Sequence, residues 1–450
     1  MDAVAGLDIG SYRVVAAVSP LAPVPPHREA RVARETGDGG APAAGPAPRG
    51  LQGLSVGSAA TLGMRRGQVL DAEELARSVR EALSRAESAA GARAAVVCLG
   101  FSGHTVVFYR HRYGSLIGKR RVNQQDLDRI NRLALVSDLP PGRRIIQAVP
   151  VEYLVDGLPV SGEPLGMYCS RLEVESVVVT ADSELIDCLV RAVHGSGLNL
   201  EIRGLLPSTL AAGRVVLSEA RQQLGAALVD IGGSCTSIAV YNHGYPAGFD
   251  VLPLGSGHIT SDLAICLRTT LEGAEEIKRK IGLGAATAGH NEQDQKDHGR
   301  ATVTFPRLSG SGYNEVPVKN VVEVVEARTC ELLELIQASL KRLSGGLELP
   351  GGVTLTGGGS SLKGIVPLAG RFLSAGAGPG STAPEVETKN PGDSLHTAGA
   401  EGLIRHWQSL YVPADDYQPP ADIWRRFKDF FGLQDKSKID SHSSFKGRIF

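Results

Sequence analysis

Two copies of an acidic, glycine-containing turn are the residues of this 450-residue chain whose types and spacing best suit chemistry. They read Leu7-Asp8-Ile9-Gly10-Ser11 and Val229-Asp230-Ile231-Gly232-Gly233-Ser234, each at the end of an apolar run. A glycine directly after a strand permits close backbone approach, so successive N–H groups can face one anion. An aspartate at the strand end can hold the water ligands of Mg²⁺. The pattern predicts a duplicated phosphate-binding hairpin, with a metal-bound nucleotide between two lobes.

The residues after each turn, 13–18 and 236–241, are again apolar and β-prone, so each turn is expected to join two strands. This argues against a Walker P-loop or a Rossmann fingerprint, in which the glycines lead into a helix. A third loop, Gly357-Gly358-Gly359-Ser360, follows a short apolar run, and glycine there lets a flat base lie against the backbone. Each loop alone could be a tight turn without a ligand. Their order and the two strand-terminal aspartates favour a nucleotide site.

Length and composition restrict the fold class and the partners. A chain of this length should form two lobes or more, because single cores stop growing well below it. Lys plus Arg number 47 and Asp plus Glu 48, which gives a net charge of −1 and no global attraction for nucleic acid. The 6 cysteines contain no Cys-x-x-Cys pair, which predicts a reducing cytoplasm and no cysteine metal site. No apolar run approaches the ~20 residues that span a bilayer, so we expect neither a secreted nor an integral protein.

Local patterns divide the chain into expected elements. The Pro-, Ala- and Gly-rich segment 20–50 predicts a disordered loop, and 71–90 predicts an amphipathic helix capped by Asp71. Residues 94–179 predict a small α+β unit, with strands at 95–99, 105–109, 144–154 and 170–180 and a helix at 123–136. Further helices are expected at 182–193, 210–221, 259–281 and 321–343, and residues 396–410 are expected to close the globular part.

The three loops resemble those of the actin/chaperone/hexokinase ATPase superfamily. Three other stretches resemble the FtsA family of bacterial cell-division proteins: Gly166-Met167 with Ser170-Arg171-Leu172-Glu173-Val174-Glu175, then Leu254-Gly255-Ser256-Gly257-His258-Ile259-Thr260-Ser261-Asp262-Leu263, and Glu272-Gly273-Ala274-Glu275-Glu276-Ile277-Lys278. The resemblance runs in order from about residue 6 to 410. It implies an α/β, actin-like ATPase fold with two lobes in four subdomains and an FtsA-type 1C subdomain inserted in the first lobe.

The implied limits are 1–93, 180–212 and 385–410 for subdomain 1A, 94–179 for 1C, 213–256 and 321–384 for 2A, and 257–320 for 2B. The resemblance also implies ATP and Mg²⁺ in the central cleft, with Asp8 and Asp230 holding the metal through water. It places Ser11, Tyr12, Gly233 and Ser234 at the phosphates, Glu275 and Lys278 at the ribose and adenine, and Gly357, Gly358, Gly359 and Ser360 at the base. Gly10, Arg13, Gly232, Cys235 and Gly255 complete the expected nucleotide-binding set. Without the family, Glu275 and Lys278 could equally be a solvated helix pair.

The chain departs from the family pattern in both phosphate loops. The first reads Gly10-Ser11-Tyr12-Arg13, where relatives more often have Thr or Ser followed by Thr or Ser and Lys. The second reads Gly233-Ser234-Cys235-Thr236, where Gly-Thr-Thr is common, so fewer hydroxyls reach the phosphates. The segment 203–209, which we expect to belong to the helix before the second loop, offers no Gln or Glu to orient a water. We expect at most a slow ATPase, in which ATP mainly holds the lobes together.

The C-terminal tail contains an amphipathic pattern at 422–432, beyond a proline-containing linker at 411–421 and before a flexible tail at 433–450. Its apolar face consists of Ile423, Trp424, Phe427, Phe430 and Phe431, and it is flanked by Arg425, Arg426 and Lys428. Aromatic residues at headgroup depth and cations toward anionic lipid are typical of an interfacial anchor. A terminal helix docked on its own body or on a partner groove fits the same periodicity. One short helix binds weakly, so firm attachment would need many copies on a filament.

The resemblance implies a nucleotide-dependent filament on the cytoplasmic side of the inner membrane, at the division septum, and the tail pattern agrees with membrane attachment. The partners that the resemblance implies are further copies of the chain, anionic lipid, the C-terminal peptide of FtsZ at about 257–320, and other divisome proteins at the 1C subdomain. The alternatives are an actin-like ATP-binding adaptor of another envelope machine, such as type IV pilus assembly, or a superfamily sugar kinase. A chaperone is disfavoured, because only residues 411–450 follow the predicted ATPase and cannot form a substrate domain.

Overall fold

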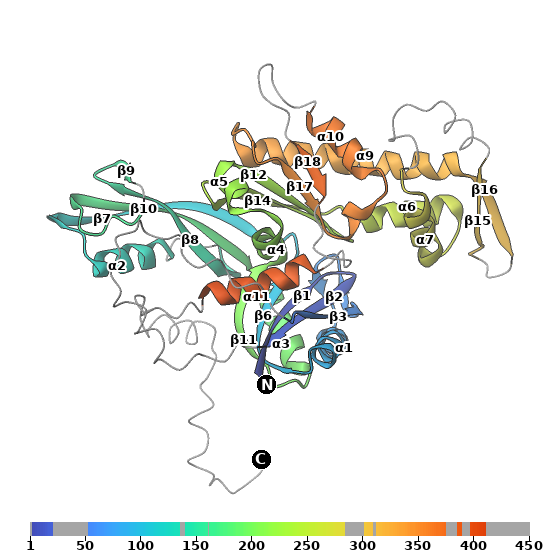
Figure 1. The fold of residues 1–450 in the computed structure, drawn as a ribbon, viewed down its shortest axis with the longest axis horizontal. Coiled ribbons are helices and arrows are strands. Elements are labelled where there is room, and N and C mark those ends of the chain that lie inside the picture. Colours follow the sequence, from blue (N-terminus) through green and yellow to red (C-terminus); the bar gives the residue numbers. More distant parts are fainter. Residues whose placement is uncertain are drawn as a thin grey trace, which may run out of the picture. The chain divides into compact units, whose positions relative to one another are not determined.

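The computed structural model describes residues 2–20, 53–135, 140–160, 162–283, 301–308, 312–374, 385–388 and 397–410 (Figure 1). The expected loop after Pro20, the linker, the amphipathic helix and the tail lie outside these ranges, so they stay predictions. Residues Met1–Trp407 form one unit, which contains both acidic turns. Within the described ranges, no helix is both long enough and apolar enough to cross a membrane.

The first acidic turn belongs to a five-stranded sheet with the order β11-β6-β1-β2-β3. Its strands are β1 (Asp2–Ile9), β2 (Arg13–Pro20), β3 (Ser55–Ala60), β6 (Arg93–Phe101) and β11 (Glu201–Pro207). β1 is antiparallel to β2 and parallel to β6, and β6 is parallel to β11. The carboxyl ends of β1, β6 and β11 therefore meet at one edge of the sheet, where the acidic turn lies.

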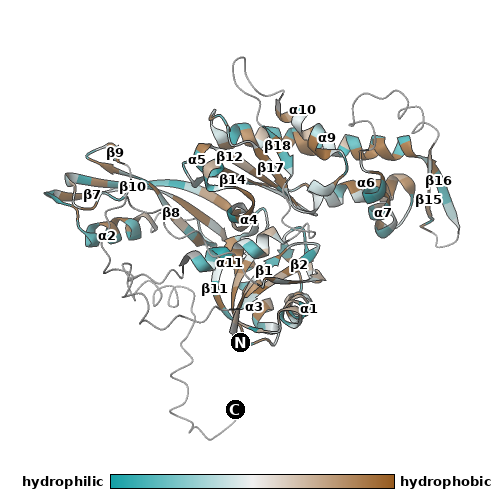
Figure 2. Cartoon of the chain, in the orientation of Figure 1, coloured by the Kyte–Doolittle hydropathy of each residue, from teal (hydrophilic) through white to brown (hydrophobic). Residues whose placement is uncertain are grey.

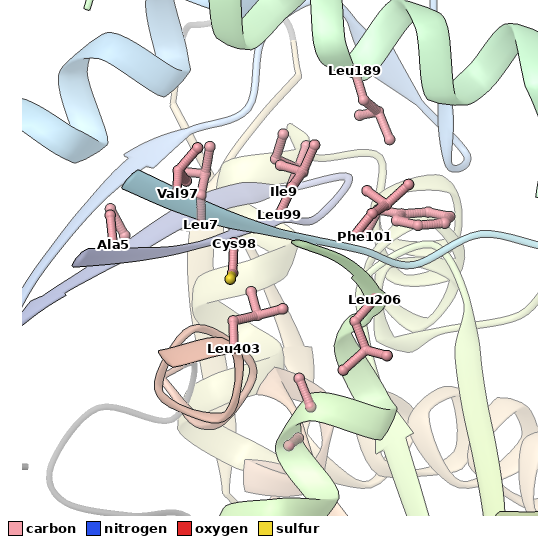
Figure 3. Packing of buried hydrophobic residues seen from close by; sticks show 14 of the residues in the cluster. Ala5, Leu7, Ile9, Val97, Cys98, Leu99, Phe101, Leu189, Leu206 and Leu403 are labelled. Atoms are coloured by element: carbon pink, nitrogen blue, oxygen red, sulfur yellow. The ribbon is translucent and has the colours of Figure 1, made fainter. Parts of the chain in front are cut away.

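Helices cover both faces of this sheet: α1 (Ala72–Ala90), α3 (Ser183–Gly195), α4 (Ser208–Val216) and α11 (Ala398–Leu410). The Asp71 carboxylate accepts hydrogen bonds from the first-turn amides of α1, and the apolar stripe of α1 is buried, which confirms the predicted helix and its cap. Figure 3 shows Leu7 and Leu99 on one face of the sheet and Cys98 on the other, facing Leu403 of α11. The alternation of side chains along the strands thus fills two helix-covered cores.

A second five-stranded sheet repeats the first. It has the order β14-β13-β12-β17-β18, and its strands are β12 (Ala226–Ile231), β13 (Thr236–Asn242), β14 (Tyr245–Leu252), β17 (Val353–Thr356) and β18 (Val386–Thr388). β12 is antiparallel to β13 and parallel to β17, as β1 is to β2 and β6. β13 is antiparallel to β14, as β2 is to β3, and β17 is parallel to β18, as β6 is to β11. The duplication predicted from two turns therefore extends to a whole sheet, and it makes the two aspartates equivalent.

The remaining elements complete this second half of the chain. They are α5 (Glu219–Leu224), α6 (Ser256–Leu267), α7 (Leu271–Ile281), α9 (Val318–Ser344), α10 (Ile365–Ser374), the 3₁₀ turn Gly358–Ser361 and the hairpin of β15 (Thr302–Pro306) and β16 (Tyr313–Pro317). A second small hairpin, β4 (Met64–Arg65) with β5 (Gln68–Val69), belongs to the first half. The buried side chains of α6, α7, α9 and α10 form one core with β12, β13 and β17.

The predicted α+β insert is a four-stranded antiparallel sheet with one helix. It consists of β7 (Val107–Arg121), α2 (Gln124–Leu135), β8 (Arg143–Val155), β9 (Leu158–Val160) and β10 (Tyr168–Asp182), with a small core that includes Leu127, Ile130 and Val174. In Figure 2 the strands of the large sheets are mainly hydrophobic, whereas α2 is mostly hydrophilic. The expected limit at residue 94 is wrong, because β6 pairs with β1 and β11 in the first sheet. The insert begins after Phe101.

Three expected helical segments differ in the structure. Residues 203–207 belong to β11, so only Ser208 and Thr209 of the segment 203–209 are helical. The expected helix 210–221 is broken where Leu217 is extended and Ser218 caps α5, and the expected helix 259–281 is broken where Arg268 is left-handed (φ 52°). A hydroxyl caps the next helix after each break. The Ser218 hydroxyl accepts a hydrogen bond from the Arg221 amide at 3.4 Å, and the Thr270 hydroxyl accepts one from the Gly273 amide at 3.1 Å. Such caps compete with continuation of the preceding helix.

The packing of α11 against α4 can be tested with two helical glycines, one inside this contact and one outside it. A Cβ at Gly402 would lie 1.9 Å from the Ala211 carbonyl oxygen, whereas a Cβ at Gly370 in α10 would meet nothing within 4 Å. We expect Gly402→Ala to lower the free energy of unfolding by about 1–3 kcal/mol, as overpacking does. Gly370→Ala should raise it by up to about 1 kcal/mol through helix propensity. Urea denaturation of both variants measures the difference, and equal shifts would contradict this packing.

Candidate functional site

The two acidic turns have the same hydrogen-bonded geometry. The Gly10 amide donates to the Arg13 carbonyl at 3.1 Å, and the Gly232 amide donates to the Cys235 carbonyl at 3.0 Å. Each bond closes a tight turn between antiparallel strands, directly after the aspartate-bearing strand end. The structure therefore confirms the predicted strand-to-strand connection in both copies.

The first loop is supported by residues from the next strand and hairpin. Thr61 donates from its hydroxyl to the Gly10 carbonyl at 2.7 Å and from its amide to the Tyr12 carbonyl at 3.1 Å. The Ser11 hydroxyl accepts a hydrogen bond from the Gly67 amide at 3.0 Å. Tyr12 and Arg13 are exposed. The backbone of this loop is thus held in place from outside the loop itself.

The second loop lies on the N-terminus of α6. The Ser256 amide donates to the Gly232 carbonyl at 2.9 Å, and the Gly257 amide donates to the Gly233 carbonyl at 2.8 Å. A Cβ at Gly255 would come within 2.6 Å of the Gly232 carbonyl oxygen, so glycine is required at this approach. Gly255 therefore acts by letting α6 reach the loop.

Asp8 and Asp230 are neighbours, because the consecutive residues Ser208 and Thr209 each hydrogen-bond to one of them and the charge of Asp8 acts on Asp230. Burial raises the pKa of Asp8 to about 6, against a hydrogen bond from Ser208 that lowers it. Burial and the charge of Asp8 raise the pKa of Asp230 to about 7, against a 3.3 Å hydrogen bond from the Thr209 hydroxyl. Each residue keeps some exposed surface, but its carboxyl group is surrounded by protein and poorly solvated. The chain thus brings two like charges into one poorly solvated place.

The carboxylate pair fits a hard divalent cation. A Cβ at Gly399 would lie 2.3 Å from Asp8 Oδ2, and a Cβ at Gly357 would lie 2.2 Å from Asp230 Oδ1, so glycines leave room beside both carboxylates. Carboxylate oxygens are the donors that Mg²⁺ prefers, and a cation would offset both the repulsion and the lost solvation. Asp8 and Asp230 are therefore the residues that would hold such an ion.

The third glycine loop is adjacent to the second acidic turn, because β17 pairs with β12. Gly357 has a positive φ of 79°, and the Ser360 hydroxyl donates to its carbonyl at 2.7 Å. Gly359 packs on Ile231, where a Cβ would come within 2.3 Å of the isoleucine Cγ2. With Gly358 between them, these residues form a side-chain-poor backbone surface beside Asp230.

The partly buried Glu275 and the buried Lys278 of α7 form a network with α6. Lys278 is only 6 % exposed, and its Nζ contacts Glu275 Oε2 at 2.6 Å, Thr260 Oγ1 at 2.9 Å and the Ser256 carbonyl at 3.2 Å. Burial lowers the pKa of Lys278 despite the carboxylate beside it. Burial of Glu275 opposes its ionisation, but hydrogen bonds from Lys278 and Thr260 keep its pKa below the ordinary value. The alternative of a solvated helix pair is wrong for Lys278.

Sequence reasoning missed three residues of this site: Ser208, Thr209 and Gly399. Ser208 and Thr209 follow β11, whose carboxyl end lies at the same sheet edge as the first acidic turn. The sequence signal that could have indicated them is the presence of two hydroxyl residues directly after the apolar end of β11. Gly399 belongs to α11, which is far along the chain, so no local pattern connects it with Asp8.

The raised pKa of Asp230 predicts a pH-dependent stability. The folded-state pKa of about 7 lies above the ordinary 3.8, so the ligand-free fold loses stability as the pH rises from about 4 to 7, and the loss is complete above pH 7. We expect Asp230→Asn to raise the melting temperature most above pH 7, and the gain to shrink as the pH falls from 7 toward 4. Differential scanning calorimetry between pH 5 and 8 measures this. The exposed Glu323→Gln should leave the profile unchanged, and a gain that is independent of pH would contradict ionisation of Asp230 as its cause.

Two solved structures share the fold. The PilM–PilN type IV pilus biogenesis complex aligns with a TM-score of 0.57 at 17% identity, over 90% of this chain and 97% of that one. MreB5 of Spiroplasma citri bound to ADP aligns with a TM-score of 0.50 at 13% identity, over 91% and 97%. The predicted actin-like fold is confirmed by these neighbours.

Sequence comparisons identify the family. The profile of cell division protein FtsA matches residues 227–398. The profile of the SHS2 domain inserted in FtsA matches residues 103–180, and this range covers most of the insert. Cell division protein FtsA of Pseudomonas aeruginosa is 30% identical over 81% of this chain and 80% of its own length. FtsA of Bacillus subtilis is 30% identical over 70% of each. On this likeness and on the inserted domain, the chain belongs to the FtsA family of bacterial cell-division proteins.

Proposed function

We propose that this FtsA-family protein binds Mg²⁺-ATP between its two acidic turns and polymerises on the cytoplasmic face of the inner membrane. There it tethers the FtsZ ring and recruits later division proteins, in part through the insert. The observation that carries the nucleotide site is the pairing of Asp8 and Asp230 at equivalent strand ends, each followed by an identically closed loop. The fold neighbour described as bound to ADP supports an adenine nucleotide.

Each group of residues has one task in this proposal. Backbone amides of the loops at 10–13 and 232–235 bind the phosphates, and Asp8 and Asp230 hold the cation through water. The Glu275–Lys278 network positions the ribose and adenine, and the Gly357–Ser360 loop forms the surface for the base. The bound Mg²⁺ would neutralise phosphate charge. Two halves of the chain that contribute to one ligand are thereby held together.

Slow hydrolysis follows from the residues that adjoin the carboxylates. The Ser208 hydroxyl donates to Asp8 and the Thr209 hydroxyl donates to Asp230, so the residues that begin α4 orient carboxylates. Neither side chain is a base able to activate a water. We therefore propose that ATP acts mainly as a bridge between the two halves and that its cleavage is slow.

A sedimentation experiment tests the nucleotide and the membrane parts together. Full-length protein should sediment with phosphatidylglycerol-containing vesicles, and more strongly with Mg²⁺-ATP, because filaments present many anchors. Asp230→Asn should remove the response to Mg²⁺-ATP, and Trp424→Glu with Phe427→Glu should remove sedimentation itself. Ser441→Glu, in the tail beyond the anchor, is the matched control and should behave as wild type.

Each arm of this experiment can fail separately. Sedimentation that is equal with and without Mg²⁺-ATP would contradict the nucleotide-dependent filament. Sedimentation that survives the two glutamates would contradict the anchor at 422–432 and favour a helix docked on protein.

An apolar groove of about 360 Å³ at the end of α6 supports a site for the FtsZ C-terminal peptide. It is lined by Ser261, Ala264, Ile265, Arg268, Thr269, Leu271 and Leu308. Ile265, Leu308 and Leu271 are 75%, 64% and 57% exposed, which is unusual for large apolar side chains on one surface. The Leu308 amide donates to the Arg268 carbonyl at 3.1 Å, so the far wall is fixed to the α6–α7 turn. We propose that apolar peptide side chains fill the groove and that an acidic group pairs with Arg268.

A charge placed in the groove tests this assignment. Ile265→Glu should weaken binding of the FtsZ C-terminal peptide at least about 10-fold, since a carboxylate would replace an apolar contact and would compete with the acidic group of the peptide for Arg268. Leu116→Glu, in the insert, changes an equally exposed leucine (79%) and should bind as wild type. Fluorescence anisotropy of the labelled peptide measures both variants. Equal affinities would place the peptide elsewhere.

A further inference from the structure

Tyr12 extends from the first loop across to the second. Its side chain is 61% exposed, yet its ring lies directly against two glycines of the other half of the chain. A Cβ at Gly233 would come within 2.3 Å of Tyr12 Cδ2, and a Cβ at Gly257 would come within 2.3 Å of Tyr12 Oη. The ring therefore occupies space that only glycine leaves open, over the second loop and the start of α6.

The phenol of Tyr12 also lies near the carboxylate expected at the ribose. Burial raises the pKa of Tyr12, and the negative charge of Glu275 raises it further. Glu275 in turn accepts hydrogen bonds from Thr260 at 2.6 Å and from Arg279 at 3.0 Å, so its position is fixed. The tyrosine thus runs from the phosphate-binding loops toward the proposed ribose contact.

Hydrogen bonds hold the backbone of Tyr12, whereas its ring is largely exposed. The Tyr12 carbonyl accepts the Thr61 amide at 3.1 Å, and the loop is closed by the bond from Gly10 to Arg13. The side chain has only two rotatable bonds, and moving the ring requires a change between staggered rotamers.

We propose that Tyr12 sets the nucleotide affinity of this chain by occupying, in the ligand-free state, the space over Gly233 and Gly257 that phosphate and ribose require. This inference rests on the proposed nucleotide site. The nucleotide binds only the fraction of molecules in which the ring has rotated away, so the apparent dissociation constant is the intrinsic one divided by that fraction. The same ring links the two halves when no nucleotide is present.

Isothermal titration calorimetry with Mg²⁺-ADP tests the effect on affinity. Tyr12→Ala should bind about 3- to 10-fold more tightly than wild type, because the competing ring is gone. Tyr12→Phe keeps the ring over both glycines and should stay near wild type. Tyr313→Ala removes an equally exposed tyrosine (68%) from β16 and is the matched control. Unchanged or weaker binding by Tyr12→Ala overturns the proposal, and weaker binding would mean that the ring stacks on the nucleotide.

Hydrogen exchange without nucleotide provides the second measurement. Tyr12→Ala should speed amide exchange in 232–235 and 255–257, since the ring no longer covers them, while Tyr313→Ala should not. Unchanged exchange in both segments also overturns the proposal. Failure of the proposed function has a different signature: neither wild type nor Tyr12→Ala would then bind Mg²⁺-ADP, whereas failure of this inference alone leaves both binding, with Tyr12→Ala no tighter than wild type.

Discussion

The close approach of two carboxylates, Asp8 and Asp230, is the constraint around which the site is built. Burial raises the pKa of both, and the charge of Asp8 raises that of Asp230 further, so the ligand-free fold is less stable when they are ionised. The approach persists because each aspartate ends a strand that is paired on both sides within its sheet. Hydrogen bonds from the Ser208 and Thr209 hydroxyls of α4 offset part of this loss of stability, but a divalent cation would offset more. Ligand binding and folding stability are therefore coupled at one point of the molecule.

Duplicated topology explains why the two carboxylates can be equivalent. The sheets share strand order and direction, so each places its acidic turn at the carboxyl edge of its parallel strands. Glycines then permit the close contacts between elements: Gly6 lies against the Ala400 carbonyl of α11, and Gly402 of α11 lies against the Ala211 carbonyl of α4. These contacts are backbone on backbone, and a single methyl group would separate the elements that surround Asp8.

Helix α6 joins three of the features described above. Its N-terminus donates amides to the second loop, its middle contributes Thr260 to the Glu275–Lys278 network, and its last turn lines the apolar groove. A helix of 12 residues is about 18 Å long and moves as one rigid element. The surface proposed for the FtsZ peptide is thus mechanically connected to the loop proposed for phosphate, and Tyr12 contacts that same loop in the ligand-free state.

Features carried by neighbouring residues were predictable from the sequence: the two Asp-Ile-Gly turns, their strand-to-strand connection, the Asp71 cap and buried stripe of α1, and the actin-like fold with its insert. Local spacing and hydrogen bonds dictate the turns and the capped helix, whereas the fold and its insert were expected from the family resemblance. Tertiary structure alone decided that β6 belongs to the first sheet, that Ser208, Thr209 and Gly399 adjoin the carboxylates, that Lys278 is buried, and that Tyr12 lies on Gly233. Each of these depends on contacts between residues distant in the chain, and the energy of such a contact is absent from any local pattern.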